Sequence, residues 1–158
     1  MSKDKVITLL GQKSITAMTK DALGGYEMTV SKAPRPYSTC KEYNLHFSPT
    51  EGLLAVNCVG ASEDDNGNWD HLRSVFDSVK KDLEAAYLLP ETENTNGPTP
   101  YRDNQSIMLM AQWSDSQGGS VLLFGMAKGD GTGQIIISYL FEGWPRYIAE
   151  VQGKDSTL

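Results

Sequence analysis

The strongest periodic pattern in the chain lies between residues 69 and 88. Apolar side chains recur there every three or four residues, so that they fall on one face of a helix. They are Leu72, Val75, Phe76, Val79, Leu83 and Ala86. Charged residues occupy the other face, Asn68 or Asp70 can cap the start, and Pro90 follows the end. The pattern predicts one long amphipathic helix that buries its apolar face against another element.

Alternation with a period of two predicts strands elsewhere in the chain. The clearest case is 41–47, where Tyr43, Leu45 and Phe47 share one face. The loop 48–52 then leads into a partner strand that is apolar on both faces, which predicts a hairpin. The predicted strands are 26–30, 41–47, 53–59, 106–113, 119–127 and 134–141, with glycine turns at 114–118 and 129–133.

The order of these elements is a hairpin, a helix and a three-strand meander. This order predicts an α+β fold with a single antiparallel sheet of about five or six strands and one long helix packed on one face. Residues 6–10 fit either a first strand or a short helix, and residues 12–23 have helical spacing that ends at Gly24 and Gly25. Arg146 to Val151 form a short closing segment.

The length of 158 residues fits one domain covering 1–158. We expect residues 1–5 and 153–158 to fray at its ends. Residues 90–104 have no periodicity and form a long polar loop.

The chain has two cysteines, and they fall on the two strands of the predicted hairpin. Pairing of these strands brings Cys40 and Cys58 opposite or nearly opposite each other on one face, within reach of a disulfide. A bridge would stabilise the fold by roughly 3 kcal/mol. The alternative is two buried free thiols, as is usual in a reducing compartment. No C-x-x-C motif occurs, which argues against a redox enzyme.

The charge balance limits the classes of partner. The formal net charge is −6 and there is no basic run, so we do not expect nucleic acid as a partner. No apolar run approaches the roughly 20 residues of a membrane helix, so we expect no membrane association. The first residues do not form a signal peptide. The expected location is periplasmic if a signal peptide has been removed, and otherwise cytoplasmic.

The motifs that carry chemistry are weak. The acidic stretch 63–70 lacks the glycine and glutamate spacing of a calcium loop. Asp64, Asp65 and Asp70 lie in this polar stretch and do not form the paired, shielded carboxylates of a hydrolase. The histidines, His46 and His71, lack metal-ligand spacing. We therefore expect no cofactor, no metal ion and no enzymatic activity.

Loops beside the predicted strands carry aromatic residues next to arginines. Tyr, Trp and Arg are enriched where proteins bind one another, although aromatics can also fill gaps over a sheet. The candidate contact residues are Arg35, Tyr37, Tyr101, Arg102, Trp144, Arg146 and Tyr147. Residues 34–37 and 144–147 each combine proline, arginine and an aromatic, which predicts two stiff projections.

Several of these features resemble a known class. The strand Tyr43–Phe47, the run Gly52–Val56, and the strand Ile137–Tyr139 are similar to segments of small bacterial α+β proteins of the toxin-immunity kind and their phage-borne relatives. The helix positions that share the resemblance are Leu72, Phe76, Leu83 and Tyr87. The resemblance covers about half the chain and brings no catalytic residues. It implies an inhibitor that binds another protein, such as a toxin or enzyme with a basic surface. In a periplasmic immunity protein a Cys40–Cys58 bridge would be expected.

A second hypothesis is a protein of phage or bacterial origin that binds or sequesters a small molecule. Arg35, Arg102 or Arg146 would then hold the phosphate of a nucleotide-like ligand. The sequence also leaves a homodimer open.

Overall fold

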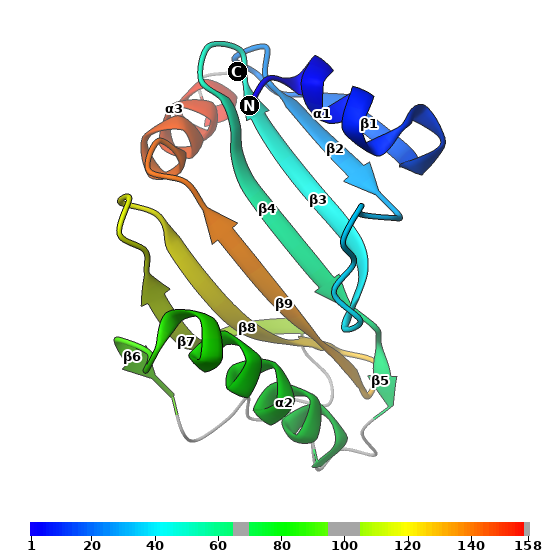
Figure 1. Ribbon diagram of the computed structural model, residues 1–158, viewed down its shortest axis with the longest axis vertical. Helices are drawn as coiled ribbons and strands as arrows, with labels where there is room; N and C mark the ends of the chain where they lie inside the picture. The colour runs from blue at the N-terminus through cyan, green and yellow to red at the C-terminus, as the bar shows by residue number, and fades with distance from the viewer. Residues whose placement is uncertain (65–69, 95–104, 157–158) are drawn as a thin grey trace.

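The computed structural model describes residues 1–64, 70–94 and 105–156 (Figure 1). Its helices are α1 (Lys3–Leu10), α2 (Asp70–Tyr87) and α3 (Trp144–Ser156), with a 3-10 turn at Gln12–Ser14. The first strands are β1 (Ile15–Lys20), β2 (Tyr26–Val30), β3 (Cys40–Ser48), β4 (Gly52–Gly60) and β5 (Glu63–Asp64). The later strands are β6 (Thr92–Glu93), β7 (Gln105–Ser114), β8 (Ser120–Lys128) and β9 (Thr132–Leu140).

All the strands belong to one antiparallel sheet in the order β1-β2-β3-β4-β9-β8-β7-β6, with the two-residue β5 beside β9. The meander β1–β4 and the meander β7–β9 are therefore joined through β4 and β9 (Figure 1). The prediction of an α+β fold with a single antiparallel sheet is confirmed. The prediction of five or six strands and one helix is wrong, because the described residues form eight strands along this path and three helices.

The segment 12–23 shows why the strand number was underestimated. Ile15 and Met18 are three residues apart, which is a helical spacing, yet both lie on the same face of strand β1. A bulge between Ile15 and Ala17 shifts the register, so that Ile15 pairs with Val30 and Met18 with Met28. The bulge thus gives an edge strand the sequence pattern of a helix.

Two helices cover one face of the sheet, which we call the inner face. The side chains of Leu72, Phe76, Val79 and Leu83 on α2 are buried against β7–β9, as the helical pattern predicts, while Ala86 is exposed. At the other side of the sheet, Val6 of α1 packs with side chains of β2 and β3. These two clusters form most of the core.

The opposite face is covered only at one end. There, Tyr147 and Val151 of α3 pack on Leu54, which is 4% exposed. Further along, no helix of the described chain lies over the apolar side chains of β4, β7, β8 and β9. We call this region the open face. It consists of Val59, Ile107, Leu109, Leu122, Phe124, Met126 and Ile136.

The two cysteines lie at disulfide-bonding distance, as the sequence predicts, although they are not directly opposite each other. Cys40 pairs with Gly60 and Cys58 with Tyr43, and a bulge after Cys40 shifts the register between them. Their Cα atoms are 5.3 Å apart, and Cys58 is buried in the core under α2. The pair therefore ties the start of β3 to the end of β4.

No helix in the described part of the chain has both the length and the apolar content needed to cross a membrane.

Reduction of the disulfide should lower the free energy of unfolding by roughly 3 kcal/mol, because the bridge closes a loop between cysteines 18 residues apart. The measurement is urea denaturation with and without a thiol reductant. A Cys40→Ala/Cys58→Ala variant is the control, and its unfolding midpoint should not respond to the reductant. An unchanged midpoint for the native chain on reduction would contradict the prediction.

Candidate functional site

The end of the sheet at which α3 packs gathers more interacting polar and aromatic side chains than any other described region, and we call it the α3 end. It contains the β1–β2, β3–β4 and β7–β8 turns and the connection from β9 to α3 (Figure 1). The connection reaches α3 beside β4 because the Phe141 amide donates to the Leu54 carbonyl at 2.9 Å.

Asp21 is the central acceptor of the α3 end. Its Oδ1 accepts hydrogen bonds from the Leu23 and Gly25 amides, both at 2.9 Å. Its Oδ2 accepts from the Tyr147 hydroxyl at 2.6 Å and lies 3.3 Å from His46 Nε2. One carboxylate, only 10% exposed, thus joins the β1–β2 turn, strand β3 and helix α3.

These contacts shift the pKa values of both Asp21 and Tyr147. Burial alone would raise the pKa of Asp21, but the hydrogen bonds from Tyr147 and from the Leu23 and Gly25 amides outweigh it and hold the pKa below its ordinary value. Burial and the adjacent Asp21 carboxylate raise the pKa of Tyr147 far above its usual range. At neutral pH the pair is therefore a carboxylate accepting from a neutral phenol.

Glycines allow this close approach. The backbone of Gly24 has φ +87°, a conformation that side chains other than glycine rarely adopt. At Gly25 an added Cβ would overlap the Tyr147 hydroxyl and lie 2.6 Å from Asp21 Oδ2. The sequence pattern predicts that this glycine pair ends a helix. Instead it closes a hairpin, and the space it leaves admits α3.

Two aromatic side chains of α3 lie against His46. The Trp144 ring meets the imidazole edge-on with ring centroids 4.9 Å apart, and the Tyr147 ring follows at 6.1 Å. His46 does lie on the polar face of β3, as its position in the alternation indicates. It is not a surface residue, because α3 leaves its side chain only 15% exposed.

The outer surface of the α3 end carries an exposed aromatic side chain and several exposed carboxylates. Phe141, in the connection between β9 and α3, is 45% exposed. The exposed carboxylates come from four separate segments of this end. They are Glu51, Asp115, Glu142 and Glu150.

Contacts place these carboxylates on one side of the α3 end. The Glu142 side chain lies against Gly118 of the β7–β8 turn, and the Glu51 carboxylate lies against Gly143. Glu51 also accepts a hydrogen bond from Arg146 Nη2 at 2.7 Å. Together with Glu150, this pair lines an open cavity of about 430 Å³. The one guanidinium among the four carboxylates is therefore already neutralised by a carboxylate partner.

The candidate contact residues inferred from the sequence do not form one surface. Trp144 is half-buried, Tyr147 is 5% exposed, and Arg146 is exposed but bonded to Glu51. Arg35 and Tyr37 precede the start of β3, so the nine residues of this strand, about 30 Å, separate them from the α3 end.

Tyr37 has a structural contact at its own end of the sheet. Its hydroxyl donates to Asp82 of α2 at 2.6 Å, and its amide donates to the Tyr43 hydroxyl. Burial and Asp82 raise the pKa of Tyr37 to about 12. Tyr101 and Arg102, the remaining candidates, lie outside the described residues.

Sequence reasoning missed Phe141 and the carboxylates near it. Phe141 was predicted as the last residue of a buried strand, whereas β9 ends at Leu140 and Phe141 begins the turn into α3. The carboxylates are spread from residue 51 to residue 150, so no linear motif contains them. The only local signal is the following Gly143 and Pro145, which indicate that the strand ends here.

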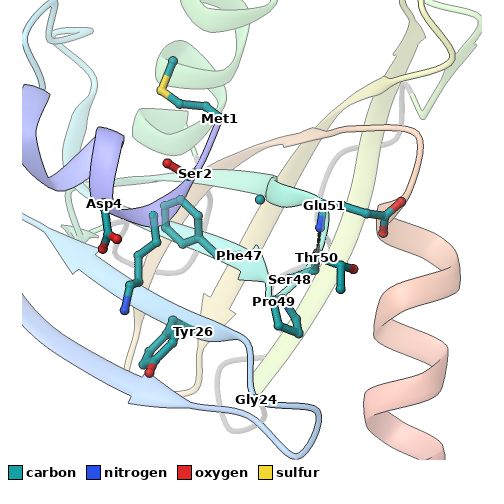
Figure 2. Close-up of a pocket in the computed structure, with 12 residues that line it drawn as sticks. Met1, Ser2, Asp4, Gly24, Tyr26, Phe47, Ser48, Pro49, Thr50 and Glu51 are labelled. Atoms are coloured by element: carbon teal, nitrogen blue, oxygen red, sulfur yellow. Dashed lines mark hydrogen bonds between the residues drawn. The ribbon is translucent and has the colours of Figure 1, made fainter.

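A second cavity, of about 400 Å³, lies between the start of α1, β2 and the β3–β4 turn (Figure 2). Figure 2 shows Tyr26, Phe47 and Pro49 on its walls, with Asp4 and Glu51 at its sides. Its cation is Lys3, whose Nζ lies 3.7 Å from the centre of the Tyr26 ring. Neither Arg35 nor Arg146 lines this cavity, and Arg146 lines the other cavity beside two carboxylates.

The acidic stretch from residue 63 is described only in part. Glu63 and Asp64 form β5, Asp65 lies outside the described residues, and Asp70 begins α2. The Glu63 carboxylate lies 3.2 Å from His71 Nε2. Over the described ranges no three His, Cys, Asp or Glu side chains come together in a group that could hold a metal ion.

Replacing Asp21 by asparagine (Asp21→Asn) should lower the free energy of unfolding by about 2 kcal/mol at neutral pH, because hydrogen bonds to a charged acceptor are lost. The native chain should also lose stability in acid. The pKa of Asp21 is lower in the folded than in the unfolded chain. Its contribution to the free energy of unfolding is therefore complete above the pKa of the unfolded state, and it disappears as the pH falls through the pKa of the folded state. Denaturation midpoints across acidic pH measure both effects.

The matched control is Glu150→Gln, which neutralises an exposed carboxylate of the same end. It should retain the acid dependence of the native chain, whereas Asp21→Asn should have a flatter profile. Parallel profiles for the native chain and Asp21→Asn would contradict the assignment of this acid dependence to Asp21.

Comparisons with models of known protein families, with curated proteins and with solved structures found no match to this chain.

Proposed function

We propose that this protein is a non-enzymatic inhibitor that acts by binding another protein, and that the α3 end is its binding surface. The observation that carries the proposal is an exposed Phe141 side chain at an end of the sheet that also presents four exposed carboxylates from four segments of the fold. An exposed aromatic residue on a surface with polar groups has the composition of the residues that dominate protein–protein binding.

The charge of this surface favours a basic partner. Four exposed carboxylates outnumber the three cations of this end, Lys20, Arg146 and Lys154, and Arg146 is already paired with Glu51. Complementary potentials steer association and raise its rate, while like charges exclude other partners. A toxin or enzyme with a cationic surface is thus the partner class that the α3 end fits.

The base of the surface is rigid. Helix α3 is anchored by the buried hydrogen bond between Tyr147 and Asp21 and by the packing of Trp144 on His46. A surface that is ordered before binding loses little conformational entropy when the partner arrives. This arrangement supports tight inhibition by a small protein.

The cysteine pair supports a role of the toxin-immunity kind. Disulfides persist in oxidising compartments such as the bacterial periplasm, where immunity proteins of exported toxins act. The sequence leaves two hypotheses, a protein inhibitor and a binder of nucleotide-like ligands. They differ in the charge that the binding surface needs. The acidic α3 end favours the first, because a phosphate needs unpaired cations.

The variant Phe141→Ala/Glu142→Lys should weaken partner binding by at least about 2 kcal/mol, roughly thirtyfold, since it removes the anchor and reverses a neighbouring charge. The measurement immobilises the native chain and the variant, applies lysate of the source cells, and quantifies retained proteins by mass spectrometry. The expected result is a basic protein that the native chain retains and the variant loses.

The matched control makes two comparable changes, one on α2 and one in the segment that follows it. Leu89→Ala truncates a side chain that is 79% exposed, and Asp77→Lys reverses an exposed charge. This control should retain the partner as the native chain does, and rising ionic strength should release it. Equal retention by the native chain and by Phe141→Ala/Glu142→Lys would overturn the proposal.

A further inference from the structure

We infer that a second copy of this chain covers the open face, forming a two-fold dimer in which the two sheets pack against each other. This inference goes beyond the proposed inhibition, because the open face lies further along the sheet than the α3 end. It rests on the register of the strands, on the absence of charge at the centre of this face and on its area.

The pairing of the strands arranges the apolar side chains in a continuous row. Val59 of β4 pairs with Ile136 of β9, Ile136 with Phe124 of β8, and Phe124 with Leu109 of β7. Residues directly opposite each other on antiparallel strands point to the same face, so the row crosses four strands.

A second pair extends this apolar area along the strands. Met126 of β8 pairs with Ile107 of β7, and both lie on the same face as Phe124 and Leu109. Ile107 is 60% exposed and Leu109 is 38% exposed. These are large apolar side chains on a strand, not at a loop tip, although no described strand pairs with β7 on its other side at these two positions.

The central strands are apolar on both faces, which is the residue pattern of strands that are covered on both faces. In β8, Val121 and Leu123 are buried on the inner face, while Leu122, Phe124 and Met126 occupy the other. An antiparallel sheet with one face in water alternates apolar and polar residues, and β8 does not. Helices α1 and α2 cover the inner face, so among the described residues the second apolar face lacks a covering layer beyond the end where α3 packs.

The absence of charge on the open face indicates which kind of partner covers it. The apolar row contains no charged side chain, and its polar neighbours along the described strands carry amides and a hydroxyl: Asn57, Gln112, Gln134 and Ser138. A basic protein or a nucleic acid would find no opposite charges here. A second copy of an acidic chain can bury this face without desolvating carboxylates, and amides can pair with amides because each donates and accepts.

The rim of the face is compatible with two-fold symmetry. Glu42 pairs with Val59 at one border of the open face, and Lys128 follows Met126 on the same face of β8. Because a two-fold interface brings the same surface of both copies together, charges of both signs at its rim can pair between the copies.

The size of the face fits a weak interface. The open face extends over about five residues along each of four strands, from Leu122 to Met126 on β8, which at the usual strand spacing gives roughly 300 Å² in projection. Because accessible surface exceeds projected area, two copies would bury an area at the low end of specific interfaces, below about 1,200 Å² in total. Two such sheets would pack about 10 Å apart, as in a β-sandwich.

The test is the mass of the purified chain in solution, measured by sedimentation equilibrium up to about 100 μM. The expected mass is twice the 17.3 kDa of the single chain, and it should persist at high salt because the interface is apolar. Phe124→Glu should raise the dissociation constant of the dimer at least about tenfold, since it places a charge at the centre of the row.

Ile107→Glu is the second variant, because a side chain that is 60% exposed can be replaced without disturbing the core, and it should dissociate the dimer as well. Leu89→Glu, a change at a 79% exposed position just after the end of α2, should leave the dimer intact. A monomer at every concentration would overturn the inference, as would a dimer that neither open-face variant weakens. Neither outcome bears on the α3 end, because the variants change only the open face. The binding experiment with Phe141→Ala/Glu142→Lys therefore tests the proposed inhibition separately.

Discussion

The pairing of β4 with β9 is the constraint on which the rest of the structure depends. It joins two meanders that lie about 80 residues apart in the chain, from Ala55 opposite Leu140 to Val59 opposite Ile136. Because of this register, Cys58 and Ile137 meet on the inner face under α2, while Val59 and Ile136 meet on the open face. The end of β9 is also brought to Leu54, where the chain turns into α3.

Asp21 holds in place the helix that the pairing of β4 with β9 brings to this end of the sheet. Without an acceptor at this point, the buried Tyr147 hydroxyl and the amides of the β1–β2 turn would lose their hydrogen-bond partner, at a cost of about 1–3 kcal/mol for each group. The α3 end therefore has a polar interior and an outer surface with a different role. Its interior fixes the position of the helix, and its surface presents Phe141 and the carboxylates.

The two surfaces that we assign to binding differ in chemistry. The α3 end presents exposed carboxylates on its turns and on α3, which suits a partner that is attracted by charge. The open face is uncharged at its centre and built from the middle of four strands, which suits a partner of the same composition.

Local periodicity by itself determined much of this protein. Helix α2, the hairpin β3–β4, the meander β7–β9 and the proximity of Cys40 to Cys58 follow from side-chain spacing and turn residues, because these elements are decided by contacts between near neighbours. Tertiary structure alone decided the rest. The bulge in β1 gives that strand a helical spacing, and the burial of His46 and Tyr147 requires α3 to cross the end of the sheet. Phe141 and its carboxylates meet because β9 ends beside β4, a long-range contact that leaves no periodic signal in the sequence.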